Sequence, residues 1–307
     1  MPPYGVMLHH FYDNEHPRGQ GAISRDDFVE LIDYIGRENI LSAEEWKARA
    51  LRGRLRDNDV CLTFDDALRC QYDVAFPVLR GMGLTGFWFV YSSVFENNIE
   101  PLEIYRYFRT TCFSSVDDFY GRFFCTTNEK YPDAYEQGLN NFSPETYLAR
   151  YPFYTRNDKI FRYLRDDVLG PERYCSIMDE MVASIGMDIK SVAKKLWMTN
   201  EQLKTLKSQG HVVGLHSYSH PTRLSAMAVS LQRDEYQRNS EHLENILGTQ
   251  SDSMSHPCNS YNQATLSILE DLGIKIGFRA NMRHMSECTR FEFPREDHAN
   301  IVKRMRA

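Results

Sequence analysis

The stretch GHVVGLHSYSHPTR, residues 210 to 223, decides how the fold of this chain is interpreted. An apolar run leads directly into His216, and His220 follows four residues later. Pro221 would break a helix at this point, so the segment is predicted to be the end of a buried strand followed by a turn. A turn can bring both imidazoles to one point, where they could bind a metal ion. A pair of hydrogen-bonded loop histidines is the alternative.

A second stretch, CLTFDDAL, places Asp65 and Asp66 at the end of another apolar run. Neighbouring side chains on a strand point in different directions, so one carboxylate could bind a metal while the other acts as a base. One carboxylate and two neutral imidazoles form a sound ligand set for Zn²⁺ or a similar divalent ion. The alternative is that one of the aspartates caps the helix that follows.

Short apolar runs alternate with amphipathic helical patterns along most of the chain. This alternation predicts an α/β fold with a mostly parallel sheet, either open or closed into a barrel. Polar residues at the ends of such strands are where binding sites are built in these folds. The predicted strands are residues 5–11, 60–66, 85–91, 211–217, 253–257, 274–280 and 291–295.

The segment between about residues 94 and 197 departs from this alternation of strands and helices, because it contains no good buried strand. It is rich in Tyr, Phe, Arg and Asp, and its patterns are helical. A structureless loop of roughly 100 residues would be improbable. We therefore expect a helical insertion at about 94–197 within a single domain that spans residues 1–307.

The composition limits the classes of function. The 307 residues are 42% hydrophobic and 25% charged, with a net charge of −6 and both signs mixed along the chain. Nothing resembles the basic footprint of a nucleic-acid binder, and no apolar run approaches the ~20 residues of a membrane helix. Seven scattered cysteines and a first stretch without signal-peptide features suggest a cytoplasmic protein with reduced thiols. The oligomeric state is not indicated.

The two motifs together resemble the polysaccharide deacetylase family (carbohydrate esterase family 4, with a NodB-type deacetylase domain). TFDDA and the later HSYSHP are similar to that family's T-F-D-D-G and H-S/T-x-x-H-P, in the same order. GVMLHHFYD resembles its first strand, and NSYNQATLSILEDLGIKIGFRA resembles a later strand–helix–strand segment. The resemblance covers residues 1–92 and 197–302 and leaves out the helical insertion.

This resemblance implies a deformed (β/α) barrel of about seven strands. It also implies a metal-dependent hydrolase that removes an N-acetyl group from an amino sugar or glycan precursor. Asp66, His216 and His220 would be the metal ligands, with Zn²⁺ as the expected ion, and Asp65 would be the base that activates a metal-bound water.

The sequence departs from the family pattern at several positions. Ala67 stands where the family has glycine, which is acceptable only if the backbone there keeps a negative φ. In the third motif, usually R-x-P-Y, Ser255 and Cys258 occupy the Arg and Tyr positions. The resemblance makes the N–H of Cys258 the candidate donor to the oxyanion. Arg295 in the late FEFPREDHAN stretch would orient Asp65, as in relatives that carry a late Pro-Arg.

The general acid is the least defined residue, because the family's late Leu-x-x-His signature is absent. His298 is the best candidate by position, with His256 and His10 as rivals. For each of these histidines, a place in a loop or in the core is the alternative.

Two other kinds of protein fit parts of the pattern. One is a non-catalytic carbohydrate-binding or regulatory protein on a deacetylase scaffold, although unused ligand residues would leave costly buried polar groups. The other is a non-haem iron oxygenase, which also uses two histidines and one carboxylate. That class usually has an all-β jelly-roll fold, and the helices predicted between the strands disfavour it.

Overall fold

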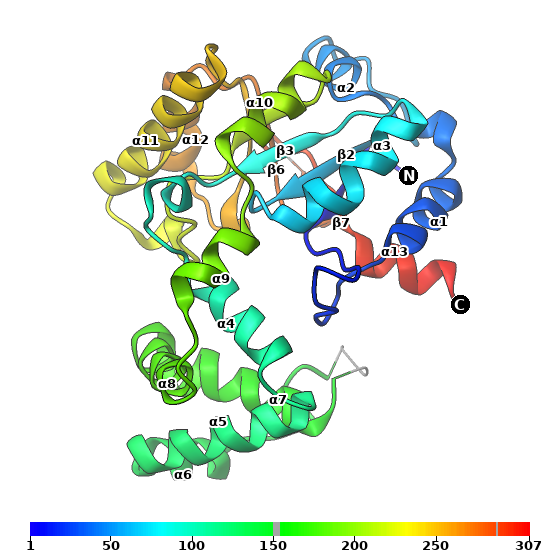
Figure 1. Cartoon of the computed structure of the whole chain (residues 1–307). Helices are drawn as coiled ribbons and strands as arrows, with labels where there is room; N and C mark the ends of the chain where they lie inside the picture. Colours follow the sequence, from blue (N-terminus) through cyan, green and yellow to red (C-terminus); the bar gives the residue numbers. More distant parts are fainter. Residues whose placement is uncertain (150–153, 287) are drawn as a thin grey trace. The chain divides into compact units, whose positions relative to one another are not determined.

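Seven short strands form one sheet in the order β6-β5-β4-β3-β2-β1-β7 (Figure 1). Every hydrogen-bonded pair of neighbouring strands is parallel. The computed structural model describes residues 1–149, 154–286 and 288–307. The strands are β1 (Tyr4–Leu8), β2 (Val60–Asp65), β3 (Phe87–Val90), β4 (Val212–Leu215), β5 (Ser253–Ser255), β6 (Ile276–Phe278) and β7 (Arg295–Asp297).

The two edges of the sheet approach each other, so the strands form a nearly closed barrel. Phe278 at the end of β6 makes an isolated parallel bridge to Phe293, and the Arg279 N–H donates to the Phe293 carbonyl at 3.0 Å. The predicted position of the last strand, 291–295, is therefore wrong, because the ladder with β1 begins only at Arg295. The predicted fold class, a deformed (β/α) barrel of about seven strands, is confirmed. The parallel α/β architecture is not a jelly roll.

Helices cover the outside of these strands (Figure 1). Local signals explain their ends: Ser24 forms a capping box before α1, and Gly248 ends α11 in the left-handed conformation. The buried face of α1 carries Phe28, Leu31 and Ile32, at the spacing of one helical face. The helices are α1 (Arg25–Ile35), α2 (Ala43–Leu51), α3 (Phe76–Met82), α10 (Asn200–Ser208), α11 (Val229–Leu247), α12 (Gln263–Asp271) and α13 (His298–Met305).

The chain divides into two compact units, and the barrel belongs to the first, Met1–Glu100 with Lys194–Ala307. The second unit is Pro101–Ala193, in whose described residues all regular elements are helical. Its core is an aromatic cluster that includes Phe108, Phe119 and Phe161. That this segment is an insertion into one domain stays a prediction. Its helices are α4 (Pro101–Thr111), α5 (Val116–Lys130), α6 (Pro132–Asn141), α7 (Arg156–Tyr163) and α8 (Gly170–Ser184), and α9 (Ile189–Leu196) crosses the boundary back to the first unit.

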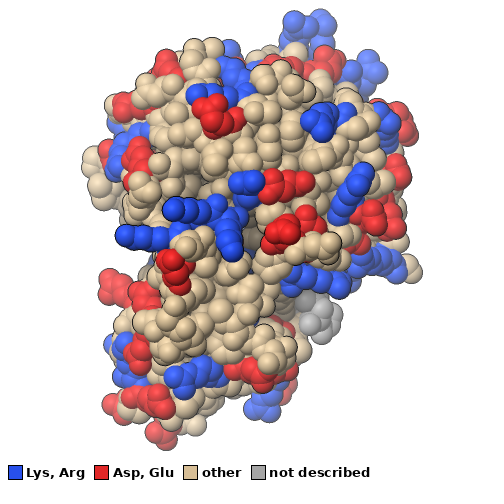
Figure 2. All heavy atoms as spheres, viewed as in Figure 1, with Lys and Arg blue, Asp and Glu red and all other residues tan. Residues whose placement is uncertain are grey.

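The surface carries charges of both signs. On the face drawn in Figure 2, acidic and basic side chains lie interspersed, as the sequence leads us to expect. None of the helices within the described ranges combines the length and the apolar character that a membrane crossing requires.

Candidate metal centre and active site

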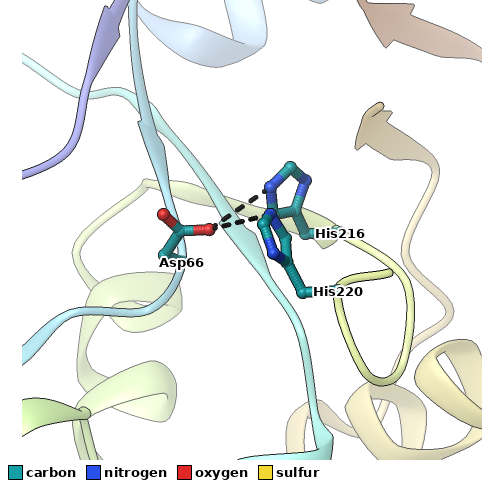
Figure 3. A group of neighbouring side chains, drawn as sticks. All are labelled: Asp66, His216 and His220. Carbon is teal, nitrogen blue, oxygen red and sulfur yellow. Dashed lines mark ion pairs between the residues drawn. The ribbon is translucent and has the colours of Figure 1, made fainter. Parts of the chain in front are cut away.

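Asp66, His216 and His220 converge at the carboxyl ends of β2 and β4 (Figure 3). Asp66 Oδ1 lies 3.4 Å from His216 Nε2 and 3.5 Å from His220 Nε2. One ligand atom from each of the three residues lies within 4.8 Å of the other two. Donor atoms that surround a common point at this spacing match the size of a small cation site.

The chemistry of this group fits a divalent cation. Asp66 Oδ1 is buried, yet it accepts no hydrogen bond from any described residue. A buried carboxylate oxygen without a donor costs free energy unless a charge or a metal ion compensates it. A carboxylate oxygen and two imidazole nitrogens are ligands that Zn²⁺ accepts, with further positions left for water and substrate.

Left-handed backbone positions build the two ligand loops. Asp66, Ala67, Ser217 and His220 have φ values of 78°, 54°, 63° and 56°. The expectation that Ala67 is acceptable only at a negative φ is therefore wrong, since this alanine occupies the left-handed region. Such positions are costly for residues other than glycine, and they persist where the surrounding structure determines them.

Helix α11 holds the loop that carries both histidines. The carboxylate of Glu235 accepts hydrogen bonds from the Tyr218 N–H at 3.0 Å and the Ser219 N–H at 2.8 Å. One turn later, Asn239 Oδ1 accepts from the His216 N–H at 3.0 Å. Glu235 and Asn239 were not predicted. Their signal in the sequence is two polar residues, four apart, on the buried stripe of an amphipathic helix.

Asp65 is buried beside the ligand group and is held by Arg295, whose side chain is fully buried. Arg295 Nη1 donates to Asp65 Oδ1 at 2.7 Å and to Thr63 Oγ1 at 3.3 Å. The Arg295 side chain passes Gly5, where an added Cβ would lie 3.2 Å from Arg295 Cγ. The structure thus brings Asp65 and Arg295 together, as the resemblance implied.

The electrostatics of the buried groups favour ionised carboxylates in the metal-free protein. Burial raises the pKa of Asp65, but the Arg295 guanidinium and His216 outweigh it, so the net pKa lies below its usual value. Burial likewise raises the pKa of Asp66, and His220 and His216 reverse the shift. For His216, burial lowers the pKa, and the two carboxylates raise it above its usual value.

The end of β5 and the turn that follows it bring Ser255 and Cys258 to the same end of the barrel. The Ser255 hydroxyl lies 3.2 Å from Asp65 Oδ1 and 2.7 Å from His216 Nδ1. Cys258 has an exposed side chain and a left-handed φ of 50°. Among the described residues, no group accepts a hydrogen bond from its N–H.

The candidate general acids lie elsewhere. His298 is buried with its ring nitrogens 3.2 Å from the Met7 carbonyl and 2.9 Å from the Gly21 carbonyl. The structure therefore does not bring it to the carboxylates. His256 is buried too: its Nε2 contacts the Phe291 carbonyl, and burial lowers its pKa to about 3.

His9, which was not predicted, is a third histidine beside the two carboxylates. Its Nε2 lies 3.8 Å from Asp65 Oδ2 and 3.9 Å from Asp66 Oδ2, and its side chain is partly exposed. The rival candidate His10 follows it, with the two rings 6.3 Å apart. The missed signal was position, because His9 is the first residue after β1 at the end of the barrel where the other groups lie.

Sequence comparisons with known proteins find similarity to polysaccharide deacetylases. A family model described as "Polysaccharide deacetylase" matches residues 181–277. A curated protein of Bacillus subtilis (strain 168), "Putative polysaccharide deacetylase YxkH", is 29% identical over 97 residues. That match covers 32% of this chain and spans only about a third, 34%, of the relative.

Solved structures extend the likeness to the whole fold. The Streptococcus pyogenes deacetylase PplD in complex with acetate has a TM-score of 0.58 and 16% identity, over 99% of this chain and 98% of that chain. IcaB from Ammonifex degensii has a TM-score of 0.56 and 16% identity, over 99% and 96%. A de-N-acetylase from Aggregatibacter actinomycetemcomitans gives a TM-score of 0.57 at 12% identity, over 99% and 100%. At these identities the likeness establishes the fold.

The two kinds of comparison complement each other. The family-model match includes the histidine motif, and the structural matches cover the barrel that carries both motifs. This chain therefore resembles the polysaccharide deacetylase family in the part of its sequence that carries the histidine motif, and it shares the fold of solved deacetylases.

Proposed function

We propose that this protein is a metal-dependent hydrolase that removes the N-acetyl group from an amino sugar or glycan precursor. One observation carries the proposal: three potential ligands, Asp66, His216 and His220, surround a common point, and Asp65 lies beside them. The family likeness supports a carbohydrate substrate.

Asp66, His216 and His220 would hold the ion, for which Zn²⁺ is the best match to one carboxylate and two imidazoles. When bound, a divalent cation lowers the pKa of water and polarises an amide carbonyl. The remaining steps of a hydrolysis belong to side chains and backbone groups of the chain itself.

Asp65 is the candidate base. Its Oδ1 is occupied by Arg295 and Ser255, whereas its Oδ2 lies 3.9 Å from His216 Nε2 and 3.8 Å from His9 Nε2. Oδ2 is therefore the atom that can take a proton from a water molecule in the site. The lowered pKa of Asp65 keeps the carboxylate ionised, as a base must be, near neutral pH.

Two further groups are suited to act on the amide during its hydrolysis, one on the carbonyl oxygen and one on the leaving amine. The Cys258 N–H, which no described residue accepts from, could donate to the oxyanion that develops on the carbonyl oxygen. His9 is placed near both carboxylates and is partly exposed, so it could protonate the leaving amine. We assign this acid role to His9 in place of His298.

The alternative is a non-catalytic carbohydrate-binding or regulatory protein on the same scaffold. It would have to retain three converging, mostly buried ligand side chains and several left-handed residues at the ligand loops. Both features carry a free-energy cost that binding alone does not require. They favour a working metal centre.

Acetate release from a panel of N-acetylated amino sugars, oligosaccharides and glycan precursors tests the proposal. Asp65→Asn should bind zinc like the unaltered protein and lose about 10²- to 10⁴-fold in turnover, as expected for removal of a general base. Asp66→Ala should lose zinc binding together with turnover. His9→Gln should reduce turnover far more than His298→Gln.

Two results would decide against the proposal. Zinc binding that survives Asp66→Ala would show that the three residues are not the ligands. Unchanged acetate release by Asp65→Asn would remove the base assignment. Zinc binding without acetate release from any member of the panel would favour the non-catalytic alternative.

A further inference from the structure

Ser255 ends strand β5 and lies, fully buried, between two groups of the proposed centre. Its Oγ is 3.2 Å from Asp65 Oδ1 and 2.7 Å from His216 Nδ1. Its own carbonyl oxygen lies 3.0 Å from the same His216 Nδ1. One residue therefore contacts the candidate base with its side chain, and a candidate metal ligand with both its side chain and its backbone.

The chemistry of these contacts determines where the hydrogens lie. A carbonyl oxygen can only accept, so the contact with His216 requires a proton on Nδ1. In the neutral imidazole, Nε2 then carries the lone pair, and Nε2 is the nitrogen that faces Asp66 Oδ1. The Ser255 hydroxyl keeps its own hydrogen for Asp65 Oδ1, because an ionised carboxylate only accepts.

We propose that Ser255 is a positioning residue whose hydroxyl links Asp65 to His216. With Arg295 it holds Oδ1 of Asp65, so that Oδ2 faces the ligand group. The backbone carbonyl of Ser255 fixes the tautomer of His216 that can bind a metal through Nε2. This inference rests on the proposed function and adds to it a residue that acts through the base.

Ser255 stands at a position where the family's third motif has a larger side chain. By resemblance, an arginine occupies this point of the third motif and orients the base. Here a small hydroxyl from β5 and the Arg295 guanidinium from β7 share Asp65 Oδ1. The two contacts approach the same oxygen from different strands, so loss of either should leave the carboxylate less well oriented.

The side-chain contact can be tested with a matched control on the same strand. Ser253 is also fully buried, but its hydroxyl has no hydrogen-bond partner among the described residues. Ser255→Ala should lower kcat about tenfold, the size expected for one hydrogen bond to a charged group, with KM unchanged within about twofold. Ser253→Ala should leave both constants unchanged, and Ser255→Thr, which keeps the hydroxyl, should restore most of kcat.

A second measurement does not depend on activity. In the metal-free protein, melting temperatures of Ser255→Ala, Asp65→Asn and the combined variant form a double-mutant cycle. If the hydroxyl acts on the carboxylate, the combined loss should be smaller than the sum of the two single losses. Ser253→Ala combined with Asp65→Asn should be additive.

The outcomes separate this inference from the proposed function. A Ser255→Ala kcat that matches that of Ser253→Ala, or an additive cycle with Asp65→Asn, would overturn the link. Coupling in the cycle without acetate release from the unaltered protein would contradict the proposed function and would support the link between Ser255 and Asp65.

Discussion

Arg295 begins strand β7, yet its charge ends beside a carboxylate at the far end of β2. The guanidinium is fully buried, and so is the Asp65 carboxylate that it contacts at 2.7 Å. A buried pair gains little over an apolar replacement of both partners, but removal of one partner leaves an uncompensated charge. The pair therefore gives the base its orientation more than it gives the fold its stability.

Replacement of Arg295 alone should nevertheless be severe, because it leaves the Asp65 charge uncompensated. Arg295→Met is expected to lower the free energy of unfolding by about 3–5 kcal/mol, because Asp65 loses its buried partner. Denaturant titration of the metal-free protein at neutral pH measures this loss.

Arg304 provides the control for this variant. It pairs with Glu296 at 3.2 Å, but its side chain is 46% exposed. Arg304→Met should cost less than about 1 kcal/mol. Asp65→Asn combined with Arg295→Met should recover part of the loss, since the unpaired charge is gone. Equal losses for the Arg295 and Arg304 variants would contradict the argument.

At the scale of elements, α11 does more than cover the barrel. Its buried stripe mixes the apolar residues Tyr236 and Leu243 with Glu235 and Asn239, which face the histidine loop. The helix thus supplies packing and, from the same face, the acceptors for the backbone N–H groups of the loop.

Glu235→Ala should therefore disturb the metal site from a distance. It removes the acceptor of two loop N–H groups and of the Ser219 hydroxyl, so the left-handed conformation at His220 loses its support. Zinc affinity should fall about 10- to 100-fold, the range typical for groups that orient metal ligands. Titration of the metal-free protein with zinc gives the affinity.

The matched control lies on the same helix. Glu241 is exposed, and among the described residues the Gln237 side chain of its own helix is the donor to its carboxylate. Glu241→Ala should leave zinc affinity unchanged. If Glu235→Ala binds zinc as tightly as Glu241→Ala, the loop does not depend on α11.

At the scale of the whole molecule, periodicity predicted most of the barrel and motif spacing predicted the ligand group. Apolar runs mark the interiors of five strands, β1, β2, β3, β4 and β6, because those strands are buried on both faces. The last strand was misplaced, since β7 consists of Arg295, Glu296 and Asp297 and carries no apolar pattern.

The rest of the site depends on contacts that no local pattern encodes. His9 reaches the carboxylates only because β1 and β2 are adjacent and in register. At Ala67 the prediction failed for a different reason, because the tertiary structure overrides a local preference. The loop between Asp66 and α3 imposes a left-handed φ on a residue that disfavours it.

The pH dependence of zinc binding joins the site to the stability of the whole chain. Burial lowers the pKa of His216, but Asp65 and Asp66 raise it above its usual value of about 6.5. In the metal-free protein the imidazolium therefore persists above that pH and contributes stability, which is lost as pH rises through the folded-state pKa. Zinc must displace this proton, so its apparent affinity should rise with pH over the same range.

Thermal unfolding with excess zinc and with a chelator, across pH 5.5 to 8, measures both effects. The metal-free protein should lose the His216 contribution as pH rises, whereas the stabilisation by zinc should increase by about 1.4 kcal/mol per pH unit where one proton is displaced. In Asp66→Ala the zinc increment should vanish at every pH. A zinc increment in the unaltered protein that is flat, or larger at pH 5.5 than at pH 8, would mean that the ion does not compete with the proton on His216.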